Sequence, residues 1–129
     1  MAAPPLAPPG VSLDANMSEA SRQRKHFNQG GDAFLFSWFY TQVKNRGPWD
    51  FKQRGAHYEA FGNFHYGAVG TAAGFSKETL LRAAGLAQTF AGTSVNAFGR
   101  WWSEAPYGDD PRDQRWIKEG IEYAKSKGF

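Results

Sequence analysis

The sequence predicts a mainly α-helical, compact single-domain fold, and three observations lead to this prediction. The chain has 129 residues, the length of one domain with its own core. Apolar residues recur at the 3.6-residue spacing of an amphipathic helix in several segments, whereas no segment sustains the alternation of a strand. Helix-capping residues precede most of these segments. A short β-hairpin near residues 60–66 is compatible with the mixed pattern there.

The chain begins with a proline-rich segment, "AAPPLAPPG", which has the composition of an extended linker. We therefore expect residues 1–10 to be a linker from a longer parent chain and residues 11–129 to form the domain. Asp14 is predicted to cap a first helix that ends near Phe27. The last turns of this helix hold the basic stretch "RQRKH", where cations suit the helix dipole.

Three more helices follow from caps and periodicity. The second is predicted to start at Asp32 and to end before "NRGP", because proline disfavours helix at the residue before it. The third has Ser76 as its N-cap and Gly92 as its stop. The fourth starts at Asp110, where the following proline fits the first helical position. Its buried stripe is predicted to comprise Ile117, Gly120, Ile121 and Ala124.

The composition excludes several classes of protein. The absence of cysteine excludes disulfides, Cys-based zinc sites and a thiol nucleophile. No apolar run reaches the roughly 18–20 residues of a transmembrane helix, so we expect no membrane insertion. The net charge is only +3, but the segment from Arg22 to Arg54 has seven Lys or Arg residues and two Asp residues. This basic half suits a polyanion, although a solvated surface explains each charge taken singly.

The candidate catalytic residues are concentrated in the stretch "HYEAFGNFHYGAVGTAAGF" and just before it. His57, Glu59, Asn63 and His65 are polar residues among aromatic rings and glycines. They are either satisfied polar groups of the core or the working groups of a cleft. A carboxylate against aromatic surface has a raised pKa and can act as a general acid, with a histidine beside it as base or orienting partner. The glycines themselves indicate close packing or a sharp turn.

Further candidates surround this stretch. In "PWDFKQR", Asp50 is a possible second carboxylate, and Lys52 and Arg54 can bind phosphate, although an Asp–Lys salt bridge explains the pattern as well. Other candidates for substrate binding are Asn63, Tyr66, Arg100, Trp101 and Asp109. Helix capping accounts for the aspartates after Asp109, and the histidines are few. We therefore expect no metal and no cofactor.

Four blocks of the sequence are similar to those of a known family. "GPWDFKQRG", "YEAFGNFHYGAVGTAAGF", "LLRAAGLAQ" and "PYGDDPRDQRWIKEGIEY" occur in the order seen in the bacterial polymorphic toxin type 44 domain. The resemblance runs from about Val11 to the last residue. Asparagine often stands in this family at the position of His65. The resemblance therefore does not imply a mechanism that requires histidine there.

The resemblance implies a secreted interbacterial toxin domain that is delivered into a target bacterium and neutralised by a cognate immunity protein. The family is usually described as a predicted nuclease, chiefly a ribonuclease. Our first hypothesis is a metal-independent ribonuclease that acts in the target cytoplasm. His57, Glu59 and His65 are the residues that can supply its acid and base, and Lys52, Arg54 and Arg100 can surround the phosphate. We expect a monomer.

Two alternatives remain open at this stage. A glutamate at a helix end, followed by Gly-Asn and a turn, resembles lysozyme-like enzymes, with Glu59 as general acid and Asp50 or Asp109 as the second carboxylate. Such a hydrolase would act on peptidoglycan in the periplasm. The other alternative is a non-enzymatic protein-binding domain, because none of the catalytic patterns is diagnostic.

Overall fold

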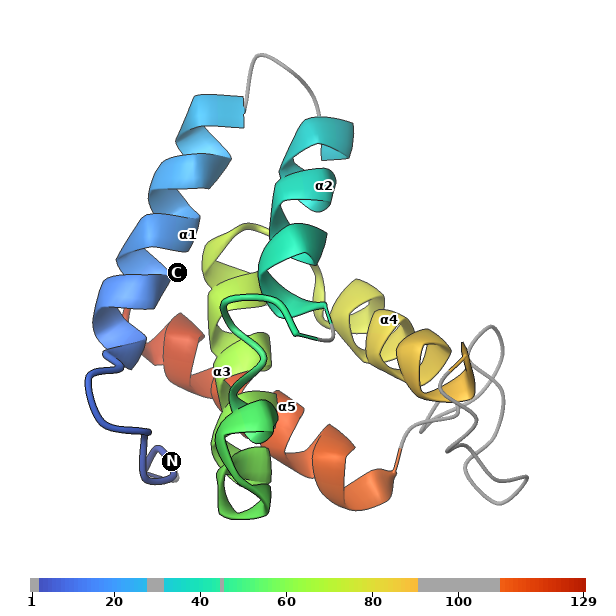
Figure 1. Cartoon of the computed structure of the whole chain (residues 1–129). Helices are drawn as coiled ribbons and strands as arrows, with labels where there is room; N and C mark the ends of the chain where they lie inside the picture. The colour runs from blue at the N-terminus through green and yellow to red at the C-terminus, as the bar shows by residue number, and fades with distance from the viewer. Residues whose placement is uncertain (1–2, 28–31, 45, 91–109) are drawn as a thin grey trace.

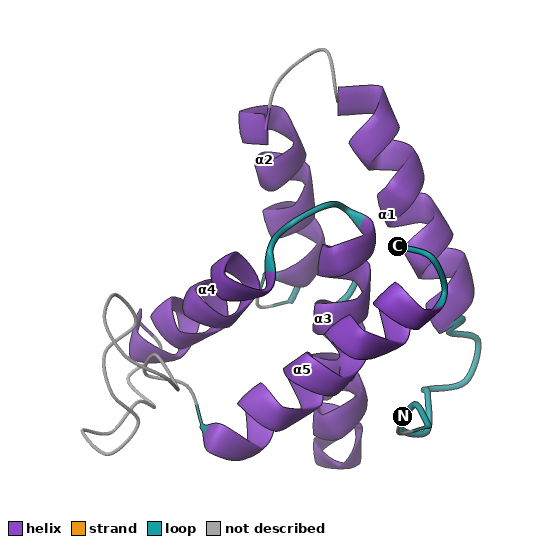
Figure 2. Ribbon diagram, turned by 180° about the vertical axis from the view of Figure 1, so that it is seen from behind, coloured by secondary structure: helices purple, strands orange, loops and turns teal. Residues whose placement is uncertain are grey.

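The computed structural model describes residues 3–27, 32–44, 46–90 and 110–129, and these ranges form α-helices and 3-10 turns without a strand (Figures 1 and 2). This confirms the mainly helical prediction. The α-helices are α1 (Leu13–Phe27), α2 (Asp32–Val43), α3 (Glu59–Ala72), α4 (Lys77–Phe90) and α5 (Pro111–Ser126). Two 3-10 turns, η1 (Phe51–Arg54) and η2 (Ala56–Tyr58), lead into α3. None of the described helices is long and apolar enough to cross a membrane.

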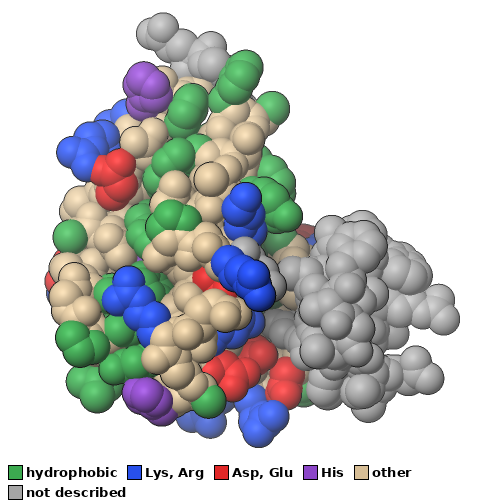
Figure 3. Space-filling view, viewed as in Figure 1, with side chains coloured by type: hydrophobic (Ala, Val, Ile, Leu, Met, Phe, Trp, Pro, Cys, Tyr) green, Lys and Arg blue, Asp and Glu red, His purple; other side chains and the backbone are tan. Residues whose placement is uncertain are grey.

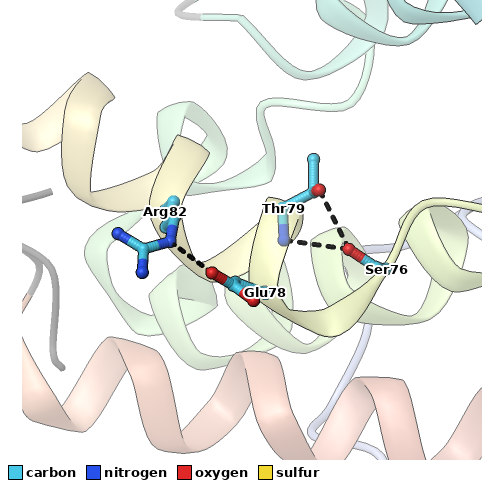
Figure 4. A network of polar contacts seen from close by, with 4 residues as sticks. All are labelled: Ser76, Glu78, Thr79 and Arg82. Atoms are coloured by element: carbon cyan, nitrogen blue, oxygen red, sulfur yellow. Dashed lines mark hydrogen bonds and ion pairs between the residues drawn. The ribbon is translucent and has the colours of Figure 1, made fainter. Parts of the chain in front are cut away.

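Most predicted helix starts are present, with local hydrogen bonds that explain them. The side chain of Asp110 accepts from the backbone N–H of Arg112 at 2.9 Å, and Pro111 occupies the first turn of α5. Ser76 Oγ accepts from the N–H of Thr79 at 3.2 Å before α4, and the guanidinium of Arg82 pairs with the carboxylate of Glu78 one turn later (Figure 4). The predicted stop at Gly92 lies outside the described residues.

The predicted cap of the first helix is wrong by two residues. Helix α1 begins at Leu13, and the hydroxyl of Ser12 accepts from the N–H of Ala15 at 3.1 Å. Asp14 therefore lies in the first turn, where an acidic side chain suits the helix dipole. Its carboxylate accepts instead from the phenol of Tyr123 at 3.0 Å. This contact ties the start of α1 to α5.

The hairpin near residues 60–66 is also wrong, because α3 is continuous from Glu59 to Ala72. Its apolar residues follow helical spacing: Phe61, Phe64, Ala68, Val69 and Ala72 are all buried. Gly67 and Gly70 are interior residues of the helix, whereas Gly74 has a φ of 96° and lies in the turn after it, as the sequence predicts. Its three glycines, Gly62, Gly67 and Gly70, reduce intrinsic helix propensity, so packing against neighbouring helices has to stabilise α3.

Helix α3 runs through the centre of the fold, and α5 crosses it closely (Figures 1 and 2). At the crossing, a Cβ added to Gly120 would overlap the carbonyl oxygen of Phe64. A Cβ added to Gly67 would in turn overlap the carbonyl oxygen of Ile117. Backbone therefore meets backbone, which requires glycine on both helices. The close-packing interpretation of the glycines is correct at this crossing.

The remaining helices enclose the two central ones incompletely. Helix α1 contributes Met17 and Ala20 to the core, and α4 contributes Leu80 and Leu81. Helix α2 contributes Leu35 and Phe39, while several of its other aromatic side chains stay exposed. The described core is thus built around α3, with α2 at its edge.

Candidate functional site

The segment that leads into α3 is held by a tight turn around Asp50. The backbone N–H of Trp49 donates to the carbonyl of Gln42 at 2.8 Å, which fastens the turn to the end of α2. Asp50 is buried, and its carboxylate accepts from the backbone N–H of Arg46 at 2.8 Å. Arg46 has a φ of 67°, a left-handed conformation that is uncommon for a residue with a side chain. Asp50 therefore stabilises a strained turn, a structural role.

Two exposed cations follow on η1. Phe51 is buried and anchors this short turn to the core, where its ring meets that of Phe61 at a centroid distance of 5.4 Å. The side chains of Lys52 and Arg54 are exposed. The guanidinium of Arg54 lies 5.4 Å from the centroid of the Phe51 ring. Aromatic anchoring thus fixes a backbone that presents two cations to solvent.

A glycine and a second 3-10 turn then present His57 and Glu59. Gly55 has a φ of 151°, and a Cβ there would lie 2.7 Å from Cε1 of His57. The imidazole ring of His57 packs on the ring of Tyr58, with 4.0 Å between centroids, yet it stays exposed. Glu59 opens α3 and is exposed as well. We call the exposed set Lys52, Arg54, His57 and Glu59 the polar end.

The start of α5 lies close to the polar end. Hydrogen bonds from Arg112 hold the pKa of the Asp110 carboxyl below its ordinary value. The same pairing raises the pKa of Arg112, and the negative charges of Asp113 and Glu59 add to this effect. Helix capping explains Asp110 and Asp113 in the sequence, but no pattern there singles out Arg112. Only the fold brings this arginine near Glu59, so no sequence signal could have indicated it.

His65 has a different environment from the polar end. Its side chain is fully buried among the rings of Trp49, Phe51 and Phe61, at centroid distances of 5.1, 4.7 and 5.6 Å. Nε2 is hydrogen-bonded to the side-chain amide of Asn16 at 3.0 Å, and among the described residues Nδ1 has no hydrogen-bond partner. Burial lowers the pKa of His65 to about 3, so the imidazole is neutral at pH 7. This geometry makes His65 a core residue that joins α1 to α3.

The other described candidates make internal contacts. The side-chain amide of Asn63 donates to the backbone carbonyl of Glu59 at 3.2 Å, one turn earlier on α3. The phenol of Tyr66 donates to the carbonyl of Leu80 at 2.7 Å, which joins α3 to α4. Arg100, Trp101 and Asp109 lie outside the described residues. Within the described ranges, no group of three or more His, Asp or Glu side chains is arranged to hold a metal ion.

The geometry also bears on the lysozyme-like alternative. That interpretation required a turn after Gly62 and Asn63, with the glutamate at the end of a helix. In the structure Glu59 is the first residue of α3, and Gly62 and Asn63 are inside the helix. Glu59 is exposed there.

Comparison with protein families gives a match that covers almost the whole chain. The family model of Bacterial toxin 44 matches residues 14–126. The chain belongs to the Bacterial toxin 44 family. All four residues of the polar end and the buried His65 lie inside the matched range. No curated protein and no solved structure matches the chain.

Membership in the Bacterial toxin 44 family indicates a bacterial toxin. It is consistent with a secreted effector that acts on other bacteria, and it suggests an immunity protein as partner. In chemical terms, this toxin domain presents two cations, an imidazole and a carboxylate within eight consecutive residues. Such a set can bind a phosphate group and move protons around it.

Proposed function

We propose that this toxin domain is a metal-independent ribonuclease that binds and cleaves RNA at the polar end. The observation that carries the proposal is the exposure of Lys52, Arg54, His57 and Glu59 on one short segment. Buried Phe51 anchors the same segment to the core, and the hydrogen-bonded turn at Asp50 holds its start. Exposed functional groups on a rigid backbone are what a site for a large polymeric substrate requires.

The proposed reaction needs one base, one acid and cations. Glu59 removes the proton from a ribose 2′-hydroxyl, and the 2′ oxygen forms a bond to the adjacent phosphorus. The bond between phosphorus and the 5′ oxygen breaks, and the imidazolium of His57 gives a proton to the leaving oxygen. The products are a 2′,3′-cyclic phosphate and a free 5′-hydroxyl. Lys52 and Arg54 stabilise the negative charge on the phosphate oxygens in the transition state.

His65 is not part of this proposed set. An imidazole without exposed surface cannot reach a substrate, and a pKa of about 3 keeps it from storing a proton at neutral pH. Asp50 is left out because its carboxylate is buried and holds the Arg46 turn.

The test is cleavage of a short labelled RNA by the purified chain, with and without EDTA. We expect cleavage in both conditions, and none of an RNA that carries 2′-deoxyribose at the scissile position, because the nucleophile is then missing. His57→Asn and Glu59→Gln should each lower the rate by about 10²–10⁴-fold. The matched controls are His26→Asn and Glu122→Gln, which change exposed residues on α1 and α5.

Targeting of the toxin to one compartment separates this proposal from the wall-hydrolase alternative. Production in the cytoplasm should stop growth and degrade RNA, whereas export to the periplasm should leave cells intact. Lysis from the periplasm alone, with RNA intact, would contradict the ribonuclease proposal. Full RNA cleavage by both the His57→Asn and Glu59→Gln variants would contradict the assignment of the polar end.

A further inference from the structure

Helix α2 carries an aromatic ridge that the described fold leaves uncovered. Leu35 and Phe39 face the core, but Phe34, Phe36 and Tyr40 keep 62%, 46% and 58% of their surface exposed. These three rings together expose on the order of 300 Å² of mostly apolar surface. The largest apolar area that a soluble monomer exposes is of this order and is often a binding surface. Figure 3 shows hydrophobic side chains over α2, with Lys or Arg side chains beyond its carboxyl end.

The exposed rings lie on two flanks of the helix. At 3.6 residues per turn, Phe34 and Phe36 are about 200° apart around the axis, whereas Phe36 and Tyr40 are only about 40° apart. Between the flanks lies a crest of exposed small residues, Ala33, Ser37 and Thr41. We call the crest and the three rings the α2 ridge. A partner must therefore reach around the helix to cover all three rings.

The crest is suited to close contact with another surface. Its side chains are small, so the backbone of α2 can approach the floor of a groove. The hydroxyl of Thr41 already donates to the carbonyl of Ser37 at 2.9 Å, so its burial would leave no donor unsatisfied. None of the crest residues belongs to the polar end, so a partner can cover them without covering the proposed catalytic residues.

The charges around the α2 ridge are mostly positive. Asp32 is the first residue of α2, but no acidic residue occurs from Ala33 to Arg46, and Lys44 and Arg46 are exposed just after the helix. Exposed Arg24 and Lys25 lie in the last turn of α1, which packs beside α2. The ridge is therefore an apolar centre with a cationic rim. That arrangement is complementary to a protein surface with an apolar groove and an acidic rim.

We propose that the α2 ridge is the docking surface for an acidic protein partner whose apolar groove receives α2. Groove binding engages both flanks and the crest together, as in other complexes in which a helix fills a groove. A flat lipid surface could take up only one flank, because Phe34 and Phe36 point in nearly opposite directions around the helix. The cations at the two ends of the ridge would meet acidic groups at the edge of the groove.

Two other occupants fit the ridge less well. A single RNA strand needs cations along its path, but Ala33 to Val43 carry no charge, and the ring of Phe36 already meets Phe75 edge-on at 6.0 Å. A second copy of the chain offers little complementary charge in its described helices, because none of them has an excess of more than one acidic residue. A different protein therefore fits the role of the acidic partner better.

The test begins with the tagged chain produced in the bacterium that encodes it. A protein that copurifies in a one-to-one ratio is identified, purified and titrated by calorimetry against three variants. We expect an acidic protein. The double variant Phe34→Asp with Tyr40→Asp should bind it at least about 100-fold more weakly. Lys44→Glu should weaken binding by about tenfold, and added salt should weaken the wild-type complex.

The controls are Leu6→Asp and Lys125→Glu, which alter an exposed apolar residue and an exposed cation away from α2. Both should bind within about twofold of wild type. All variants change exposed side chains, and thermal unfolding verifies that each is folded. Absence of a one-to-one partner would overturn the proposal, as would a partner that binds the double variant normally.

Two further binding measurements test the alternative ligands of the α2 ridge. One uses a 20-nucleotide RNA, and the other uses vesicles that contain phosphatidylglycerol. The double variant should leave binding to both unchanged. If it loses binding to the RNA or the vesicles while partner binding persists, the ridge serves that ligand and the protein proposal fails. Because none of the altered residues belongs to the polar end, a failure of the ribonuclease proposal leaves this experiment interpretable.

Discussion

Helices α2 and α3 are both rich in aromatic residues, yet the rings are mostly buried on α3 and largely exposed on α2. Helix α3 buries Phe61 and Phe64 completely, together with the ring of His65. Helix α2 leaves three of its rings exposed. The difference in burial arises from the number of helices and turns that pack against each helix. Helix α3 contacts α1, α4, α5 and both 3-10 turns, whereas α2 packs mainly on α1 and the turn that follows it. Aromatic content therefore indicates apolar surface, and the number of neighbouring elements decides whether that surface becomes core.

Glycine explains why α3 acquires so many neighbours. Gly67 lets the carbonyl of Ile117 approach the helix, and Gly70 leaves space for the side chain of Leu80 from α4. Helix α2 has no glycine between Asp32 and Val43, and its aromatic side chains hold other backbones at a distance. The two helices thus divide the tasks of the domain, with α3 organising the core and α2 presenting a surface.

The largest effect should come from removing one ring from each helix. Phe64→Ala deletes a ring without exposed surface and leaves a cavity at the crossing with α5, so we expect a loss of about 3–5 kcal/mol in the free energy of unfolding. Phe34→Ala should change it by no more than about 0.5 kcal/mol, because that ring is already largely in water. Urea unfolding followed by circular dichroism measures both. Equal losses would show that α2 is as firmly packed as α3.

A smaller loss of folding stability should follow when the pH is lowered below 6.5. Burial lowers the pKa of His65 to about 3, whereas the unfolded chain binds the proton near the ordinary value of 6.5. The unfolded state therefore takes up more protons between these values, and the stability present above pH 6.5 is lost as the pH falls. With about 1.4 kcal/mol per pH unit, His65 should cost the folded state roughly 2–3 kcal/mol at pH 4.5.

The variant His65→Asn tests this assignment. It should be less stable than wild type at pH 7, because the shorter side chain leaves space among Trp49, Phe51 and Phe61. Its free energy of unfolding should nevertheless fall less steeply between pH 6.5 and 4.5. The control His57→Asn changes an exposed imidazole and should follow the wild-type curve. If His65→Asn and wild type lose stability in parallel, His65 is not the group responsible.

Much of the fold was predictable because its signals are local. The cap at Asp110, the Ser76 cap and the apolar spacing of α2, α4 and α5 each depend on neighbouring residues of the chain. Helix α3 was not predictable in this way, since its glycines at positions 62, 67 and 70 resemble turn signals when only the neighbouring residues are considered. Gly67 and Gly70 serve close contacts with Ile117 and Leu80, which are remote along the chain, and tertiary packing therefore overrides a weak local propensity.

The candidate site was predictable only as a set of residue types. The pattern could not separate buried His65 from exposed His57, because both are flanked by aromatic residues in the sequence. Burial of His65 depends on Trp49 and on Asn16 from α1, which are remote along the chain. Asp50 similarly suggested a carboxylate for catalysis, although its partner is the backbone of Arg46. Proximity of Arg112 to Glu59 likewise exists only in the folded chain.

The smallest effect should distinguish a structural from a substrate-binding role at Tyr66. Its phenol donates to the carbonyl of Leu80 at 2.7 Å, and its ring lies beside that of Phe39 from α2. Tyr66→Phe keeps the ring and removes the hydroxyl, so we expect a loss of about 1 kcal/mol in the free energy of unfolding. RNA cleavage should be unchanged, because Tyr66 serves the contact between helices. A tenfold loss of cleavage with unchanged stability would instead place Tyr66 among the substrate-binding residues, and the site would then extend from the polar end along α3.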